Sequence, residues 1–243
     1  MSVEPVLDDP AERVVQATIR LLAEQGPSVI KARTVASASG LSTMAVYHHF
    51  GGIAELLRAV ADHGYNELDA AFAQVPVTDD PIADLFTIAL TTRRIARDNP
   101  HLYDLMFGLS MRATYRPIAD VRLSGRSPAF RAAYAHLIDA CERLVSSGRI
   151  GPAQPDMIAA ELWSLVHGYI TLELAELFTE FADPVQQVLL PLGVTVAVGL
   201  GDTRERAQAS HETAVRRFVP TAKGTRRRAG HAARPAKRSS TRR

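Results

Sequence analysis

The sequence predicts an all-α protein built of two helical domains. Apolar residues make up 47% of its 243 residues and charged residues 22%, a balance typical of a globular chain with a sizeable core. Apolar side chains recur at helical spacing between proline and glycine breaks. No convincing alternation with a period of two residues is present, so strands are not expected.

The first helix is expected to begin at Asp9 and to end before Gly26. Asp9 can cap a helix, Pro10 suits the first helical position, and Glu12 stands where a capping box requires an acid. Apolar residues then recur at helical spacing up to Gly26, which stops the helix together with the proline that follows it.

Three more helices should follow in close succession. A short helix is predicted at about residues 31–38, and Gly40 breaks it. Ser42 can cap the next short helix, which ends at the glycine pair that starts at Gly51. Apolar residues at helical spacing predict a longer fourth helix over residues 53–72.

The second domain is predicted to contain only helices. It begins after a turn-rich segment, and its helices are separated by proline and glycine breaks. Helices are expected near residues 82–98, 101–111, 128–147, 155–181 and 184–198. The predicted domains are residues 1–75 and 76–221, and they are followed by a tail, residues 222–243, whose composition is typical of disorder.

Composition also predicts where the chain resides. Its N-terminus is acidic and lacks the apolar segment of a signal peptide, and its longest nearly apolar run, residues 188–201, is too short to span a membrane. The single cysteine, Cys141, excludes an internal disulfide, and no spacing of cysteine and histidine indicates a zinc site. We therefore expect a cytoplasmic protein with no metal and no cofactor.

Charge is distributed unevenly along the chain. The basic tail, residues 222–243, holds nine Lys and Arg and no acid, whereas the rest of the chain holds 19 Lys and Arg against 26 Asp and Glu. The acidic body repels a polyanion on average, so contact with nucleic acid there requires a local surface. We expect the tail to attract the phosphate backbone regardless of base sequence.

Ala36, Gly40 and Val46 have the spacing of a helix-turn-helix. Such a motif needs a small residue where two helices cross, a glycine in the turn and an apolar residue that holds the second helix. The outer face of the second helix is then free to enter a major groove. DNA binding is favoured over a plain helical hairpin because the flanking helices and a Tyr-His-His-Phe segment accompany the spacing. The residues presented for contact are Ser42, Thr43, Met44, Tyr47 and His48.

His48 and His49 do not form a good pair of metal ligands. Adjacent residues on a helix point about 100° apart, whereas two ligands on one helix are usually four residues apart. Phe50, which follows them, is interpreted as a core residue.

The stretch from Asp9 to about Phe72 resembles the TetR family of transcriptional regulators. The resemblance rests on the order of the helices and on the segments Ala-x3-Gly-Leu-Ser and Tyr-x-His-Phe. It implies a dimeric repressor with an N-terminal three-helix DNA-binding domain and a C-terminal helical domain that binds a small molecule and dimerises. It also implies DNA contacts by Arg33, Thr34, Ser42, Thr43, Met44, Tyr47, His48 and His49, with Tyr47 on a phosphate and Thr43 and Met44 at base edges.

Two positions depart from the family's pattern. Lys31 replaces the usual Ser or Thr cap of the second helix, and we expect it to reach a phosphate instead. Gly52 and Ile53 stand near the start of the fourth helix, where many members have a lysine. A usual phosphate contact should be missing there, which bears on affinity and not on the fold.

Residues 161–177 resemble the Trp-x3-His-Gly pattern of one C-terminal subgroup of the family. Trp163 and His167 are four residues apart and share a helix face, and Gly168 permits close helix packing. Two interpretations stay open, a core and dimer interface or a ligand contact by His167. The candidates for lining a ligand cavity, each with core packing as the alternative, are Phe86, Leu90, Tyr103, Met106, Phe107, Met111, Trp163 and His167.

Enzyme activity is not expected. Glu173 and Glu176 are interpreted as exposed helix charges and not as an acid/base pair, and no phosphate loop or nucleotide fingerprint is present. The sequence therefore predicts a regulator that binds a pseudo-palindromic DNA operator as a homodimer, responds to a hydrophobic small molecule and has no membrane partner. The alternative is an architectural DNA-binding protein whose second domain only dimerises.

Overall fold

The structure is a computed structural model that describes residues 9–107 and 127–218. These residues form helices and no strand, so the predicted all-α fold is confirmed. The α-helices are α1 (Pro10–Gln25), α2 (Ala32–Ser39), α3 (Thr43–Phe50), α4 (Ile53–Phe72), α5 (Pro81–Asp98), α6 (Pro100–Phe107), α7 (Pro128–Ser146), α8 (Pro155–Leu174), α9 (Leu190–Gly199) and α10 (Arg204–Arg217). A 3-10 turn (Pro27–Val29) follows α1, and a π-helical turn, η3 (Val185–Leu189), precedes α9.

Two of the predicted helix caps are confirmed. The Asp9 side chain accepts a hydrogen bond of 2.9 Å from the N–H of Ala11 at the start of α1. The Ser42 hydroxyl accepts one of 3.1 Å from the N–H of Ala45 at the start of α3. Each cap satisfies a backbone donor that the first helical turn leaves unpaired, so both helices begin where the sequence places them.

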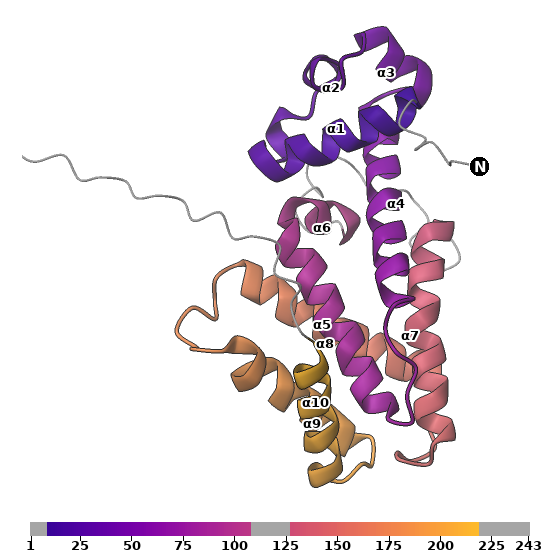
Figure 1. The fold of residues 1–243 in the computed structure, drawn as a ribbon, viewed down its shortest axis with the longest axis vertical. Helices are drawn as coiled ribbons and strands as arrows, with labels where there is room; N and C mark the ends of the chain where they lie inside the picture. Colours follow the sequence, from indigo (N-terminus) through magenta and orange to yellow (C-terminus); the bar gives the residue numbers. More distant parts are fainter. Residues whose placement is uncertain (1–8, 108–126, 219–243) are drawn as a thin grey trace, which may run out of the picture.

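Helices α1, α2 and α3 form one end of the molecule, and α4 leads away from them (Figure 1). The first part of α4 packs on α1 and α3, and the rest of the helix packs on α6 and α7. Helix α4 is therefore shared by the two halves of the protein, so a shift of α6 or α7 reaches α1 and α3 through one continuous helix.

The second half is a bundle in which α5 lies between α7, α8 and α10. Helix α10 packs on both α5 and α9. None of the helices within residues 9–107 and 127–218 combines the length and apolar character needed to cross a membrane.

The structure differs from the predicted helices in three places. Helix α8 ends at Leu174 and does not continue to residue 181, because Glu176 adopts a left-handed φ of 61° and the N–H of Leu177 bonds to the carbonyl of Leu172. Helix α10 was not predicted, since its buried face consists of Ala207, Ser210, His211 and Ala214 and carries no hydrophobic periodicity. The predicted helix at residues 101–111 is described only as far as Phe107.

Candidate functional site

The helix-turn-helix of α2 and α3 has the predicted geometry. Ala36 and Val46 are 3% and 0% exposed, so both face the core where the two helices meet. Gly40 has φ 69° and ψ 27°, a left-handed conformation that glycine adopts at little cost. The N–H of Leu41 then bonds to the carbonyl of Ala36 at 2.9 Å and fixes the turn between the helices.

Arg13 supports this turn and was not identified from the sequence. Its Nη2 donates a 2.9 Å hydrogen bond to the carbonyl of Ser39, which ties α1 to the end of α2. A Cβ atom at Gly40 would lie 3.3 Å from the same Nη2, so glycine is favoured there by space as well as by φ. Arg13 and Ser39 are 26 residues apart, and no local pattern reveals their contact.

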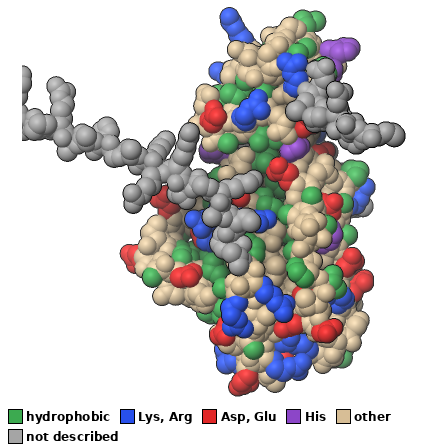
Figure 2. Space-filling view, in the orientation of Figure 1, with side chains coloured by type: hydrophobic (Ala, Val, Ile, Leu, Met, Phe, Trp, Pro, Cys, Tyr) green, Lys and Arg blue, Asp and Glu red, His purple; other side chains and the backbone are tan. Residues whose placement is uncertain are grey.

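Most side chains of α3 face outward. Val46 is its buried residue, whereas Met44 is 75% exposed and Tyr47 is 49% exposed. Lys, Arg and His side chains lie at this end of the molecule (Figure 2). The predicted contacts Lys31, Arg33, Ser42, Thr43, Met44, Tyr47, His48 and His49 are all exposed, and Thr34 is half-buried.

The two histidines of α3 lie edge to face, with ring centroids 5.3 Å apart. Within the described ranges, no three His, Cys, Asp or Glu side chains converge as a metal site would require. Phe50 is half-buried and packs against the core, as expected.

An apolar pocket of about 60 Å³ lies within the C-terminal bundle. Its walls come from α5, α7, α8, α9 and α10 and include Phe86, Ala89, Leu144, Trp163, Ala197 and His211. Among the side chains that line it, Thr92, Trp163 and His211 carry polar atoms. A pocket of this kind suits a small, mostly apolar molecule.

The candidate ligand residues separate into two groups. Phe86 and Trp163 line the pocket, whereas Leu90 is a core residue outside it. Tyr103, Phe107 and His167 form an aromatic cluster beside Trp163, and Met106 packs between α6 and α4. Met111 lies outside the described residues.

Within the aromatic cluster, a hydrogen bond joins α6 to α8. The Oη of Tyr103 lies 2.5 Å from Nδ1 of His167, and the His167 ring lies 4.2 Å from that of Trp163 between centroids. Burial lowers the pKa of His167 to about 3 and raises the pKa of Tyr103, so both side chains are neutral near pH 7. Nε2 of His167 is buried without a hydrogen-bond partner among the described residues.

Helix α6 packs closely on α4 at Gly64. A Cβ atom at Gly64 would lie 2.5 Å from Sδ of Met106, so the two helices approach closely only because this residue has no side chain. The hydroxyl of Tyr65 donates to the carbonyl of Met106 beside this contact. Together with the aromatic cluster, these contacts form a continuous path from the pocket wall at Trp163 to α4.

Two family models match these two halves of the chain. The model for bacterial regulatory proteins of the tetR family matches residues 14–60, and the model for the tetracyclin repressor-like C-terminal domain matches residues 85–190. The chain belongs to the TetR family of transcriptional regulators. It is therefore a regulator with a helix-turn-helix DNA-binding domain and not an enzyme. The narrower resemblance to a Trp-x3-His-Gly subgroup stays a prediction.

Relatives of this TetR-family chain support the same assignment. Uncharacterized HTH-type transcriptional regulators from two strains of Mycobacterium tuberculosis are 27% identical over 150 residues, which cover 61% of this chain. The match spans 66% of the length of these curated relatives.

Solved structures share the fold. A protein of unknown function from Rhodococcus sp. RHA1 has a TM-score of 0.67 and 22% identity, with 82% of this chain and 100% of that chain covered. RolR in complex with resorcinol has a TM-score of 0.58 and 15% identity, with 83% of this chain and 92% of that chain covered. RolR without ligand has a TM-score of 0.61 and 14% identity, with 83% of this chain and 96% of that chain covered.

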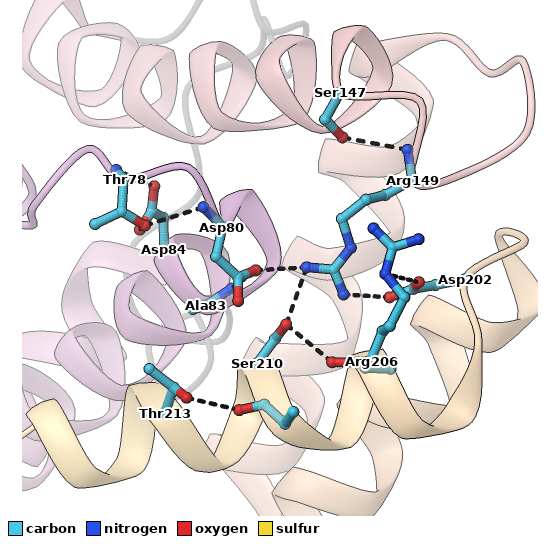
Figure 3. Close-up of polar contacts among 12 residues, drawn as sticks. Thr78, Asp80, Ala83, Asp84, Ser147, Arg149, Asp202, Arg206, Ser210 and Thr213 are labelled. Atoms are coloured by element: carbon cyan, nitrogen blue, oxygen red, sulfur yellow. Dashed lines mark hydrogen bonds and ion pairs between the residues drawn. The ribbon is translucent and has the colours of Figure 1, made fainter.

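A buried arginine ties together the end of the bundle away from the helix-turn-helix (Figure 3). The Arg149 guanidinium donates to Asp80 at 2.6 Å, to Asp202 at 2.5 Å and to Ser210 at 2.9 Å. Its side chain is 9% exposed, so its charge is neutralised by two carboxylates and not by water. The cluster joins α5, α10 and the loop before α8 around the pocket.

One expectation about the second domain is wrong, and another finds no support among the described residues. Glu173 is not an exposed helix charge, because its carboxylate receives hydrogen bonds from Nε and Nη2 of Arg93 and its side chain is 12% exposed. Gly168 is exposed, and no described group lies within 4 Å of the position of its Cβ atom. The predicted close helix packing at Gly168 therefore has no partner among residues 9–107 and 127–218.

Proposed function

We propose that this TetR-family regulator is a ligand-responsive repressor that binds a pseudo-palindromic operator as a homodimer. The observation that carries the proposal is the path from an apolar pocket, through the aromatic cluster and α6, to the helix that supports the helix-turn-helix. In this proposal, residues 1–75 bind DNA, and residues 76–221 bind the effector and dimerise.

The exposed face of α3 supports recognition of a major groove. Tyr47 contacts a phosphate and positions the helix, while Thr43 and Met44 meet base edges. Lys31 and Arg33, exposed at the start of α2, add phosphate contacts.

The pocket supports an effector that is mostly apolar. Its apolar walls and few polar atoms suit an apolar molecule, and its volume of about 60 Å³ favours a very small one. The likeness to the resorcinol-bound regulator is one of fold, so the proposed effector class depends on the pocket of this chain.

Coupling follows the contacts already described. An effector in the pocket displaces Trp163, and the movement passes through His167 and its hydrogen bond to Tyr103 on α6. Helix α6 is packed against Gly64, so α4 must shift with it. The distance between the two recognition helices of a dimer then ceases to match one groove repeat of about 34 Å.

Exposed apolar side chains support a second copy of the chain as a partner. Apart from Val77, the large exposed apolar residues described in the second half occur on α8, on the turn after it and on α9: Met157, Leu172, Leu177, Phe181 and Leu192. Such side chains, together with the exposed Gly168, suit a face that is covered by a partner better than one that is exposed to solvent.

The test couples a compound screen to DNA binding. Hydrophobic and amphipathic compounds that raise the melting temperature are added to the protein on an operator obtained by selection. We expect these compounds to release the DNA, and the complex without them to contain two chains per operator. Compounds that stabilise the protein and leave operator affinity unchanged would support the architectural alternative.

A variant that fills the pocket sharpens this test. Ala89→Leu enlarges a side chain that lines the pocket, whereas Ala132→Leu makes the same change at an exposed position of α7. We expect Ala89→Leu to keep operator affinity within about twofold and to lose the response to the compound, and Ala132→Leu to keep both. Equal responses in the two variants would place the effector elsewhere.

A further inference from the structure

His211 on α10 offers the pocket a ring nitrogen with open hydrogen-bonding capacity. The other polar side chains differ from it: the Thr92 hydroxyl donates to the carbonyl of Ile88 at 2.9 Å and keeps weaker acceptor lone pairs, and Trp163 has a donor and no acceptor. His211 is 4% exposed and lines the same pocket.

The tautomer of His211 is fixed by its backbone contact. Nδ1 lies 2.7 Å from the carbonyl oxygen of Ala207, which can only accept a hydrogen bond, so Nδ1 carries the hydrogen. Nε2 of the neutral ring is therefore an acceptor. Across residues 9–107 and 127–218, no group donates a hydrogen bond to it. Burial lowers the pKa of His211, which keeps the ring neutral and Nε2 free to accept.

The ring is also held in place. Phe86 packs on it with centroids 4.5 Å apart. Gly193 of α9 lies at its edge, where a Cβ atom would overlap Nε2. Because Gly193 also lines the pocket, its missing side chain leaves the approach to Nε2 open.

Charged groups surround the outer side of His211. Asp80, Arg149 and Asp202 act on it from the start of α5, the loop before α8 and the turn before α10. Arg206 also pairs with Asp202, at 3.8 Å, so two guanidiniums balance the two carboxylates. An anion is disfavoured because an ionised carboxylate has no hydrogen to donate to Nε2.

We infer that Nε2 of His211 is the hydrogen-bond acceptor of the pocket, which therefore selects an apolar molecule with one donor group, such as a phenol or an alcohol. Ethers of the same shape and carboxylates are disfavoured. This inference rests on the proposed effector role of the pocket and names the chemical class that the pocket takes.

The test compares donors with their methyl ethers. The probes are small because the pocket is small: phenol with anisole, and cyclopentanol with its methyl ether. Binding to the full chain is measured by calorimetry. We expect each donor to bind wild type about tenfold more tightly than its ether, because the ether leaves Nε2 unpaired. In His211→Phe, which keeps a flat ring, that ratio should fall to about one. In Thr92→Val, the matched control at the other polar position, the tenfold ratio should remain.

Two further variants and a change of pH sharpen the test. His211→Gln restores an acceptor and should restore part of the ratio, while Gly193→Ala should abolish it by closing the approach to Nε2. In wild type the ratio should fall as the pH is lowered, because protonation places a hydrogen on Nε2 and removes the acceptor. Since burial lowers the pKa of His211, this loss should begin at a lower pH than for an ordinary histidine of pKa about 6.5.

The outcomes separate this inference from the effector role. If the donors bind and release DNA but His211→Phe keeps the tenfold ratio, or if Thr92→Val loses it, the role of His211 is wrong and the effector role stands. If wild type binds neither donors nor ethers while the protein still binds its operator, both proposals for the pocket fail.

Discussion

At the scale of single residues, the environments of α3 differ sharply over short distances. Val46 is fully buried, whereas Met44, two residues earlier, is 75% exposed. Burying a valine stabilises a protein by about 1.5–3 kcal/mol, so Val46, together with the half-buried Phe50, fixes the orientation of this short helix. An exposed methionine contributes little to folding and is free to serve binding.

The recognition helix yields a prediction that separates two kinds of contact. Tyr47→Ala and Tyr47→Phe should weaken binding to all DNA sequences alike, because a phosphate contact positions the protein without specifying a sequence. Thr43→Ala and Met44→Ala should change which bases are preferred, by about 1–3 kcal/mol for each base pair whose recognition is removed. Selection followed by footprinting measures both effects. Binding that is unchanged in all four variants would remove α3 from the interface.

At the scale of elements, the contact between α4 and α6 depends on a missing side chain. Gly64 lies inside α4, where alanine is usually the better residue by about 1 kcal/mol. Its use there is explained by Met106, whose Sδ would lie 2.5 Å from a Cβ atom. The helix gives up intrinsic stability for a close approach to α6.

We expect Gly64→Ala to destabilise the protein by about 1–2 kcal/mol, since the strain at Met106 exceeds the gain in helix propensity. Gly199→Ala is the matched control, because no described group lies within 4 Å of its Cβ position and its φ is not positive. It should be neutral or stabilising by up to about 1 kcal/mol. Urea unfolding gives the free energy of unfolding of both variants. Equal values would show that α6 does not pack closely on Gly64 in solution.

At the scale of the whole molecule, charge opposes DNA binding over most of the chain. The basic tail, residues 222–243, carries nine cations, whereas the remainder has 26 acids and 19 cations. The tail lies outside the described residues, so its role stays a prediction. Near the start of α4, Gly52 and Ile53 stand where many members of the family are expected to have a lysine, so an additional source of positive charge is more valuable.

Deleting residues 222–243 should reduce the dependence of DNA affinity on salt and leave the preferred operator sequence intact. Each phosphate neutralised adds about 0.9 to the salt slope, and with about half of the cations engaged the slope should fall by several units. Association at low salt should slow as well. A tail of equal length with serine at every Lys and Arg is the control for chain length. A full salt slope and association rate after deletion would show that the tail has no role on DNA.

The helix-turn-helix was predictable because its determinants are local. Asp9 and Ser42 cap helices through bonds within three residues, and Gly40 supplies a left-handed turn. Each of these preferences acts on the chain in isolation, and tertiary packing did not override it. The exposure of α3 followed from the same spacing.

The interior of the second half was decided by tertiary structure. Phe86 and Trp163 meet at the pocket, while Tyr103 and Phe107, which look alike in sequence, pack in the aromatic cluster. The angles at which helices pack decide whether such a side chain reaches the pocket or the core. The helical period of the sequence does not reveal these angles.

The contacts of the polar residues His211 and Arg149 likewise could not be predicted from the sequence. Arg149 meets Asp80, Asp202 and Ser210 across separations of 53 to 69 residues, and His211 reaches the pocket on a helix with no apolar stripe. The sequence by itself determined the helices of the N-terminal half and the exposed face of α3, because caps, turns and periodicity act over a few residues. Only the tertiary structure decided which polar groups enter the pocket, because burial and partner choice arise when distant helices pack together.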